Sequence, residues 1–364
     1  MIDINFKKYT EVLNKIFGKF LFSENIPTNE NNTNQIDTSP CKIPFERLEI
    51  YPDGDIIPCC PDFLQEIFVA GNIELQEFDE IWNGKIFSEL RNKLMKGDFS
   101  FCKRNICNSY TPYLQDKIPS DYKKGPKEIR ITYDKECNYK CITCRDNIIT
   151  NEPEKIDLYN NVYLPKILEA AENLECVSLS GAGDPLFSRH LKNLIKNLIK
   201  IRPNLKFTLF TNGFFLNEET LTELGIQNNI QGISVSLDAA TRETYKKILR
   251  TDAFDRVVKN LEKMSEWKKN GKIEWLSINF VIHSLNYKEM PDFVKLAQRL
   301  DVNANFSTYR PWQSAKYHEQ YEEAAVFEPF NKNYKEFVEI LHNPIFKDKT
   351  HCFFEQKLSE IVYS

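Results

Sequence analysis

Three cysteines near the middle of the chain have a spacing that suits metal chemistry. Cys137, Cys141 and Cys144 form a CxxxCxxC run directly after a strand-like segment, residues 128–133. Three thiolates can ligate three irons of a cubane and leave the fourth iron open. A zinc ion would need a fourth thiolate or an imidazole to complete its tetrahedron. Positions i, i+4 and i+7 also mark one face of a helix, so three buried structural cysteines are a further interpretation.

Five more of the ten cysteines gather in the first third of the chain, namely Cys41, Cys59, Cys60, Cys102 and Cys107. In a reducing compartment such thiols bind metal or do chemistry more often than they form disulfides. Residues 45–51 and 56–60 read as two short strands around Pro52-Asp53-Gly54-Asp55, which is a hairpin signal. Side chains alternate along a strand, so only one of Cys59 and Cys60 can easily face a shared site. Four of the five thiols would complete either an iron-sulfur cluster or a zinc site.

The rest of the chain must position these thiols. From residue 127 strand-like and helix-like segments alternate. Strands are predicted at 128–133, 176–180, 206–210, 232–237, 274–282 and 302–306, and helices at 158–173, 190–201, 218–224, 254–269 and 288–300. Such alternation predicts an α/β fold with a parallel sheet and right-handed crossovers. Periodicity alone does not choose between an open doubly wound sheet and a complete or partial barrel.

Changes in composition and in the type of predicted element divide the chain into five segments. We expect an amphipathic helix at 1–22, a linker at 23–37, a cysteine-rich hairpin-helix module at 38–126 with a helix at 78–96, an α/β core at 127–310 and a C-terminal segment at 311–364. No stretch approaches the roughly 18 apolar residues of a membrane span. The net charge of −4, with both signs interleaved, gives no basic stripe for nucleic acid. We therefore expect a cytoplasmic protein without a nucleic-acid or membrane partner.

The CxxxCxxC run after the first strand resembles the signature of the radical S-adenosylmethionine (radical SAM) superfamily. The resemblance implies a partial (β/α)6 TIM-type barrel and a [4Fe-4S] cluster on Cys137, Cys141 and Cys144, with SAM on the open iron. Reductive cleavage of SAM would then give a 5′-deoxyadenosyl radical that abstracts hydrogen from a substrate. Arg145, directly after the third cysteine, is a candidate to neutralise the cluster or touch SAM, and an exposed loop charge is the equal alternative.

Segments after the following strands resemble parts of this family that contact SAM. The run 180–185, Ser-Gly-Ala-Gly-Asp-Pro, looks like the family's GGEP motif, with Ala in place of the second Gly and Asp in place of Glu. The resemblance assigns SAM binding to four residues of this run, Gly181, Ala182, Gly183 and Asp184. Asn212 and Ser236 lie in segments that resemble those lining the SAM ribose and the substrate side.

The N-terminal module resembles the SPASM domain, which carries auxiliary clusters. Cys41, Gly54 and Cys59 reproduce its Cys…Gly-x4-Cys hairpin, and residues 71–73 and 80–83 look like its continuation. The resemblance implies a second, auxiliary [4Fe-4S] cluster on Cys41, Cys59, Cys102 and Cys107. The family usually spaces the last pair as CxxC and places this domain after the barrel, whereas here it comes before.

These resemblances imply a radical SAM oxidoreductase or transferase that acts on a peptide, protein or sugar-like small molecule. A small flavodoxin- or ferredoxin-type protein would supply electrons. The alternative is a non-catalytic iron-sulfur or zinc protein, or a redox sensor.

Three residues outside the motifs complete the expectations. Cys176 is expected in the core, and His283 lies at a strand end, where a structural role is the commoner one. Residues 351–361 echo 41–50, so the C-terminal segment is predicted to be the truncated start of a second auxiliary module, with Cys352 a former ligand or a late ligand to an existing cluster.

Overall fold

The computed structural model describes residues 39–104, 107, 110–113, 118, 120–179, 182–310 and 320–363. The predicted segments 1–22 and 23–37 lie outside this range. The chain divides into two compact units, residues 1–124, here called the cysteine unit, and residues 125–364, here called the α/β unit. Among the helices described, none is long and apolar enough to cross a membrane.

The cysteine unit contains the predicted hairpin. Its strands are β1 (Arg47–Ile50), β2 (Asp55–Ile57) and β3 (Gly71–Asn72), with Glu49 opposite Ile57 and Asp55 opposite Asn72 in antiparallel pairs. The turn between β1 and β2, η1 (Pro52–Gly54), has positive φ at Asp53 and Gly54. Its short helices are α2 (Ile43–Glu46), η2 (Pro61–Phe63) and η4 (Tyr122–Lys124).

The single helix predicted at 78–96 is wrong, because the structure has two helices, α3 (Phe78–Trp82) and α4 (Lys85–Met95). The chain turns at Asn83 and Gly84, and a Cβ on Gly84 would lie 2.6 Å from the carbonyl oxygen of Glu80. The break lets α4 pack its apolar side into a core of seven buried residues: Phe45, Ile57, Leu64, Leu90, Leu94, Phe101 and Tyr113.

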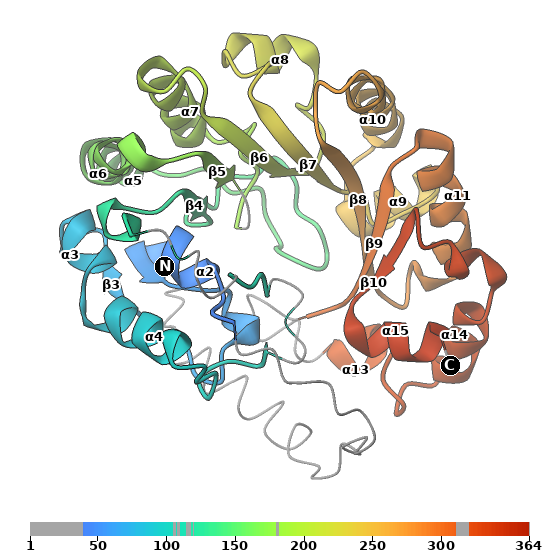
Figure 1. Ribbon diagram of the computed structural model, residues 1–364. Helices are drawn as coiled ribbons and strands as arrows, with labels where there is room; N and C mark the ends of the chain where they lie inside the picture. Colours follow the sequence, from blue (N-terminus) through green and yellow to red (C-terminus); the bar gives the residue numbers. More distant parts are fainter. Residues whose placement is uncertain are drawn as a thin grey trace. The chain divides into compact units, whose positions relative to one another are not determined.

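The α/β unit is built on seven parallel strands that are neighbours in chain order (Figure 1). They are β4 (Glu128–Ile131), β5 (Cys176–Leu179), β6 (Lys206–Thr211), β7 (Ile230–Ser236), β8 (Trp275–Ile282), β9 (Asn303–Thr308) and β10 (Cys352–Phe354). A doubly wound sheet reverses its strand order at a switch point. The order here runs one way, as in a barrel, and confirms the predicted fold class of an α/β partial barrel.

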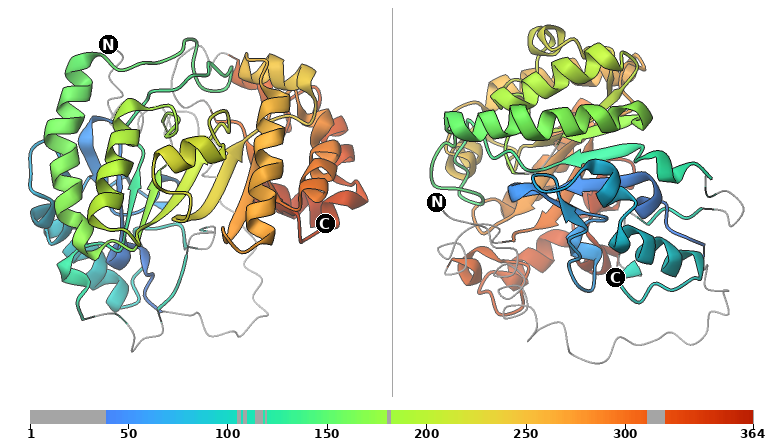
Figure 2. Two further views of the ribbon diagram at one scale, coloured as in Figure 1. Left: turned by 90° about the horizontal axis from the view of Figure 1, so that it is seen from above. Right: turned by 90° about the vertical axis from the view of Figure 1, so that its left-hand side faces the viewer.

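Helices cover the outer side of these strands (Figures 1 and 2). The helical segments of the α/β unit are α5 (Pro153–Leu158), the π-helical η5 (Tyr159–Tyr163), α6 (Leu164–Ala170), η6 (Ala171–Asn173), α7 (Arg189–Ile201), α8 (Glu218–Glu223), α9 (Arg242–Leu249), α10 (Phe254–Lys269), η7 (Tyr287–Glu289), α11 (Met290–Leu300), α13 (Tyr321–Ala324), α14 (Tyr334–Leu341), η8 (Pro344–Lys347) and α15 (Gln356–Tyr363). Those seen on the outer side in Figure 1 include α7, α8, α10 and α11. Helix α9 was not predicted. Alternate residues of each strand face these helices, as Phe280 of β8 does against Phe293 of α11, with ring centroids 4.8 Å apart.

The C-terminal segment differs from the expectation of a truncated module. Cys352 lies on β10 opposite Ala304 of β9 and is only 2% exposed. Phe354 stacks on Phe306 with ring centroids 4.9 Å apart, and α15 follows at once. These apolar contacts make the segment a seventh strand-helix step of the sheet rather than a hairpin like that of residues 47–57 or a loosely packed end.

Candidate metal centres

The CxxxCxxC loop follows β4 and is not helical. Cys137 forms an isolated bridge with Ile149, with N–H···O distances of 2.9 and 3.3 Å in the two directions. Cys144 N donates to Cys141 O at 3.0 Å across a turn. Ile142 N donates to Ile248 O at 2.9 Å, which ties the loop to the end of α9. This geometry excludes the interpretation of three cysteines along one helix face.

Cys137 is buried and Cys141 and Cys144 are half-buried, and two of the three sulfurs lie beside hydrogen-bond donors. Arg145 Nε and Nη2 lie 3.3 and 3.2 Å from Cys144 Sγ, and Asn212 Nδ2 lies 3.8 Å from Cys137 Sγ. Burial raises the pKa of Cys137 to about 11 and holds the pKa of Cys141 well above its usual range. Without a metal these raised pKa values favour the neutral thiol. Bound iron would favour the thiolate instead, because its positive charge stabilises the negative sulfur. The donor set of three thiols with N–H groups aimed at sulfur fits an iron-sulfur cluster.

Two buried carboxylates ahead of the cysteines fix the start of the loop. Asp134 accepts from the Glu136 backbone N–H at 2.9 Å, Asn151 Nδ2 at 2.7 Å and Ser188 Oγ at 2.6 Å. Glu136 accepts from Arg189 Nη2 at 2.7 Å and from the Arg189 backbone N–H at 2.8 Å. The loop is therefore attached to the first turn of α7. Sequence reasoning missed both carboxylates, although their place between the strand and the first cysteine was an available signal.

The glycine-rich segment after β5 packs directly against this loop. Ser180 and Gly181 lie outside the described residues. A Cβ on Gly183 would lie 2.4 Å from Glu136 O and 2.7 Å from Asp134 O, so no larger residue fits without moving one of the two segments. Ala182 offers its carbonyl oxygen to Arg145 Nη2. The segment 182–184 and the cysteine loop therefore form one packed unit.

Asp184, expected to contact SAM, has its carboxylate turned inward. It accepts from the backbone N–H groups of Leu186 at 3.0 Å and Phe187 at 3.1 Å, and from Thr211 Oγ1 at 2.7 Å and Asn212 N at 2.8 Å. Burial raises its pKa, and these hydrogen bonds oppose that rise. The side chain joins the loop after β5 to the loop after β6. Any contact of Asp184 with SAM would have to come from its backbone.

The remaining predicted SAM-side residues follow the next two strands. Asn212 comes after β6 and donates from Nδ2 to Asn138 Oδ1 at 2.9 Å as well as facing Cys137. Ser236 ends β7 and is exposed. The carboxyl ends of adjacent parallel strands share one edge of a sheet. The predicted residues that the structure describes therefore gather at the carboxyl edge of β4 to β7.

Asp238, two residues beyond Ser236, is a buried carboxyl that the sequence did not single out as a site residue. Its backbone has a φ of 56°, and its Oδ1 accepts from Val281 N at 2.7 Å. Burial raises the pKa of Asp238 to about 7. Its charge in turn raises the pKa of Cys141, which places it near the cysteine loop.

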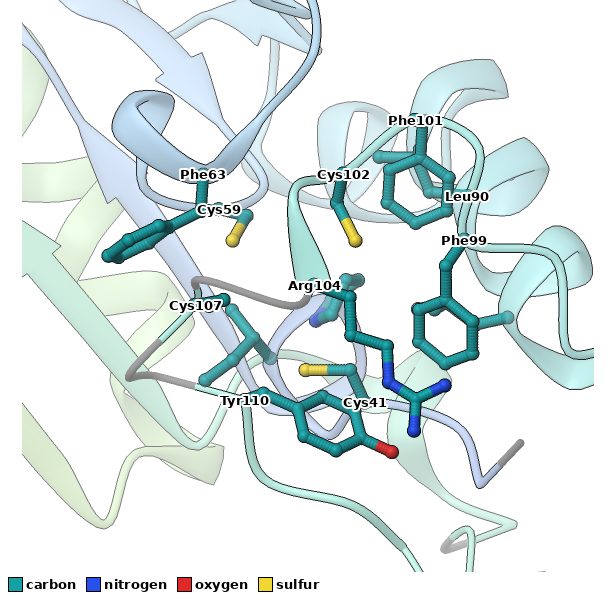
Figure 3. A pocket seen from close by; sticks show the side chains of 13 residues that line it. Cys41, Cys59, Phe63, Leu90, Phe99, Phe101, Cys102, Arg104, Cys107 and Tyr110 are labelled. Atoms are coloured by element: carbon teal, nitrogen blue, oxygen red, sulfur yellow. The ribbon is translucent and has the colours of Figure 1, made fainter. Parts of the chain in front are cut away.

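The cysteine unit holds the second group of thiols. Cys41, Cys59, Cys102 and Cys107 line one pocket together with aromatic and aliphatic side chains (Figure 3). The sulfurs of Cys41, Cys59 and Cys102 point toward a common space. Cys60, the doubtful fifth member, is not among the residues that line the pocket.

Backbone pairing explains how thiols so far apart in sequence meet. Cys41 bridges Pro112, and Cys102 bridges Leu64 just beyond the end of the hairpin. Cys59 follows β2, and Cys107 N donates to Arg104 O at 3.1 Å in a turn. Two backbone bridges, Cys41 with Pro112 and Leu64 with Cys102, therefore bring these distant segments together around the pocket.

Among the described residues that line the pocket, Arg104 carries the one positive charge, and most of the others besides the cysteines are aromatic or aliphatic. The Arg104 guanidinium lies 4.4 Å from the ring centroid of Phe99 and 4.6 Å from that of Tyr110. Burial raises the pKa of Cys102 to about 11, and the Arg104 charge opposes this rise. Within the described part of the chain, no three Cys, His, Asp or Glu side chains are arranged to hold a single metal ion. Zinc draws its sulfurs to about 2.3 Å from one atom, whereas a cubane binds each thiolate at a different iron. Four thiols around one pocket supply one ligand for each iron of a cubane.

Other predicted residues lie apart from both groups. Cys176 is only half-buried, contrary to expectation, because its Sγ lies on the strand face that carries Thr208 Oγ1, 3.7 Å away. His283 accepts the Leu285 N–H at Nδ1, 3.1 Å away, and burial lowers its pKa to about 4. These contacts describe a structural strand-end histidine.

Comparison with known families matches two domains in this chain. Residues 135–297 match the radical SAM superfamily, and residues 41–108 match SPASM, an iron-sulfur cluster-binding domain. A probable GTP 3′,8-cyclase of Saccharolobus islandicus is 30% identical over 188 residues, which cover 49% of this chain and 54% of the relative. The GTP 3′,8-cyclase of Nautilia profundicola is 28% identical over 182 residues, with the same two shares. The chain thus spans about half the length of the curated relatives it matches.

Two solved structures show lower similarity. Streptococcus suis SuiB bound to S-adenosylmethionine is 16% identical with a TM-score of 0.44, covering 88% of this chain and 72% of that one. An anSMEcpe structure with bound AdoMet and a Kp18Cys peptide is 18% identical with a TM-score of 0.40, covering 62% and 63%.

The family matches fall on the two groups of thiols described above. Cys137, Cys141 and Cys144 lie inside the first match, and the four thiols of the pocket lie inside the second. The matched domains carry the predicted cofactors, a [4Fe-4S] cluster with SAM and an auxiliary iron-sulfur cluster. The chain therefore contains a radical SAM domain that is preceded by a SPASM domain.

Proposed function

We propose that this protein is a radical SAM enzyme that cleaves SAM reductively and abstracts hydrogen from a polar substrate. One observation carries the proposal. The three thiols stand in a single loop at the carboxyl edge of β4, and that loop is packed against the segment 182–184 and against Asn212. A merely structural metal site would not require these two neighbouring loops to meet the cysteines.

Each residue has a distinct task in this proposal. Cys137, Cys141 and Cys144 would hold a [4Fe-4S] cluster, which supplies the electron that breaks the sulfonium bond of bound SAM. The backbone of 182–184 would face the SAM amino group, while Asn212 and Ser236 would line its ribose and the substrate side. The buried carboxylates Asp134, Glu136 and Asp184 hold these loops next to one another through the hydrogen bonds described above.

The side chains on the strand face that points away from the helices are polar, which is consistent with a polar substrate. Ser277 Oγ and Asn279 Nδ2 donate to Ser234 Oγ at 3.1 and 2.7 Å, and Asn305 Nδ2 donates to Asn279 Oδ1 at 3.1 Å. A closed barrel would fill this face with branched apolar side chains. Neutral hydrogen-bonding groups here favour a peptide or a sugar-like molecule. Because the cyclase relatives are named for GTP, that nucleotide belongs in the same substrate screen.

The four-thiol pocket would hold the auxiliary cluster on Cys41, Cys59, Cys102 and Cys107. A small flavodoxin- or ferredoxin-type protein would deliver electrons to the enzyme. The alternative, a non-catalytic iron-sulfur protein or redox sensor, needs neither Asn212 beside Cys137 nor the tight contact of Gly183 with the cysteine loop.

The test is SAM cleavage by anaerobically reconstituted protein. With dithionite and SAM, the wild type should release 5′-deoxyadenosine and methionine, quantified by mass spectrometry. Cys141→Ala should abolish this release, because it removes a cluster ligand. Cys176→Ala is the matched control and should retain it, since Cys176 faces Thr208 rather than the loop. Continued cleavage after replacement of all three loop cysteines would refute the proposal.

A further inference from the structure

Arg145 is a buried cation that belongs to the cysteine loop. It follows Cys144 directly and is only 7% exposed. A guanidinium has five N–H donors in a rigid planar fork and stays charged in proteins. Burying such a group is costly unless its donors are paired. The groups that accept hydrogen bonds from Arg145 therefore indicate which part of the site its positive charge stabilises.

All the acceptors that the structure gives Arg145 belong to two loops at the site. Nη1 donates to Lys135 O at 2.8 Å, at the start of the cysteine loop. Nη2 donates to Ala182 O, in the glycine-rich segment. Nε and Nη2 both point at Cys144 Sγ, 3.3 and 3.2 Å away. The two carbonyls fix the plane of the guanidinium so that one edge faces the sulfur.

The charge of Arg145 acts on thiols rather than on a carboxylate. Two of its N–H groups, on Nε and Nη2, lie within 3.3 Å of Cys144 Sγ. In the part of the chain that the structure describes, no carboxylate forms an ion pair with Arg145. Arg250 provides a contrast, because it pairs with Asp146 at 3.7 Å and its side chain is 37% exposed.

We propose that Arg145 is a positioning residue that raises the reduction potential of the cluster held by Cys137, Cys141 and Cys144. Hydrogen bonds to cluster sulfurs and nearby charge are among the factors that set such potentials. Reduction adds one electron to the cluster, so a fixed positive charge with two N–H groups on Cys144 Sγ stabilises the reduced state more than the oxidised one. The inference rests on the proposed function, because it requires the cluster.

The test is a redox titration of the full-length holoprotein, followed by electron paramagnetic resonance with dithionite as reductant. The signal of this cluster is identified as the one that changes when SAM is added. Arg145→Gln removes the charge, and Arg145→Lys keeps the charge but loses the fork. We expect the midpoint of Arg145→Gln to become more negative by at least about 59 mV, which is a tenfold change in a one-electron equilibrium. Arg145→Lys should lie between Arg145→Gln and the wild type.

Arg250→Gln is the matched control, because it removes a nearby cation that does not contact sulfur, and it should keep the wild-type midpoint. The inference is overturned if an Arg145 variant with wild-type iron content also has the wild-type midpoint. It is overturned equally if neither Arg145 variant binds iron, since Arg145 would then be needed for folding of the loop. A wild-type protein without a SAM-sensitive signal would instead refute the proposed function itself, and this inference with it.

Discussion

At the scale of single residues, the cysteine loop depends on side chains that the CxxxCxxC spacing does not contain. Asp134, Glu136 and Asp184 are each at most 2% exposed, and each accepts several hydrogen bonds. Buried carboxylates are tolerated only with such partners. The loop also requires a glycine at position 183, because a Cβ there would clash with the carbonyl oxygens of Asp134 and Glu136. The positions of the three thiols therefore depend on the conformation of the loop backbone, which these carboxylates and Gly183 stabilise.

Gly183→Ala should separate the cysteine loop from the glycine-rich segment. The new methyl group would lie 2.4 and 2.7 Å from backbone oxygens that cannot move without shifting the loop. Overpacking of this kind costs roughly 1–3 kcal/mol. We expect at least a tenfold loss in the rate of 5′-deoxyadenosine release, measured by liquid chromatography. Gly271→Ala is the control for backbone strain without a steric clash, because its φ is 68° but a Cβ there has nothing within 4 Å, and it should keep the wild-type rate of cleavage. Unchanged cleavage by Gly183→Ala would contradict the packing argument.

At the scale of elements, helix α7 and the π-helical turn η5 are joined around His190. Its Nε2 lies 2.7 Å from Tyr133 Oη and its Nδ1 lies 2.9 Å from Asn160 Oδ1. The rings of Tyr159 and Tyr133 lie 5.1 and 5.7 Å from the imidazole. Because Asn160 Oδ1 can only accept, Nδ1 carries the proton and Nε2 accepts from the tyrosine. A neutral imidazole therefore satisfies both hydrogen bonds of the His190 ring nitrogens.

The neutral His190 predicts loss of stability in mild acid. Burial lowers the pKa of His190 to about 4 from an unfolded value of 6.5. The unfolded chain therefore binds a proton first, and the stability due to His190 is present above pH 6.5 and is lost as the pH falls toward 4. Between pH 7.5 and 5.5 the wild type should lose roughly 1.4 kcal/mol more than His190→Asn. Denaturant unfolding of both proteins under anaerobic conditions measures this. Equal losses would contradict a neutral His190.

At the scale of the whole molecule, the chain carries two compact units with one group of thiols each. We propose that residues 38–126 form the auxiliary-cluster module and 127–310 the radical SAM core, with β10 adding a further strand to the sheet of the core. The two groups differ in construction, since three thiols stand in one loop and four come together from separate segments. In the proposed arrangement, the cluster on three thiols would leave one iron open for SAM, whereas the cluster on four thiols would be fully ligated.

Iron counting should distinguish the two sites. Reconstituted wild type should contain about eight irons per chain from two cubanes, and the variant without Cys137, Cys141 and Cys144 should retain about four. Replacement of Cys41 and Cys102 should likewise leave about four and preserve the SAM-sensitive signal. Stoichiometric zinc with little iron in the first variant would show that the pocket of Figure 3 is a zinc site.

The sequence by itself determined what depends on local spacing. The periods of the strands and helices from residue 128 onward, the hairpin around Gly54 and the order of the glycine-rich and Asn212 segments after the cysteines were all predictable, because each lies within a short stretch of chain. Contacts between distant segments could not be predicted in this way. Only the tertiary structure decided that Asp184 turns its carboxylate inward, that Gly84 breaks a helix, that Cys352 joins a seventh strand and that Arg145 faces Cys144 Sγ. Each of these outcomes depends on a neighbour that the fold supplies, such as the carbonyl of Ala182 for Arg145.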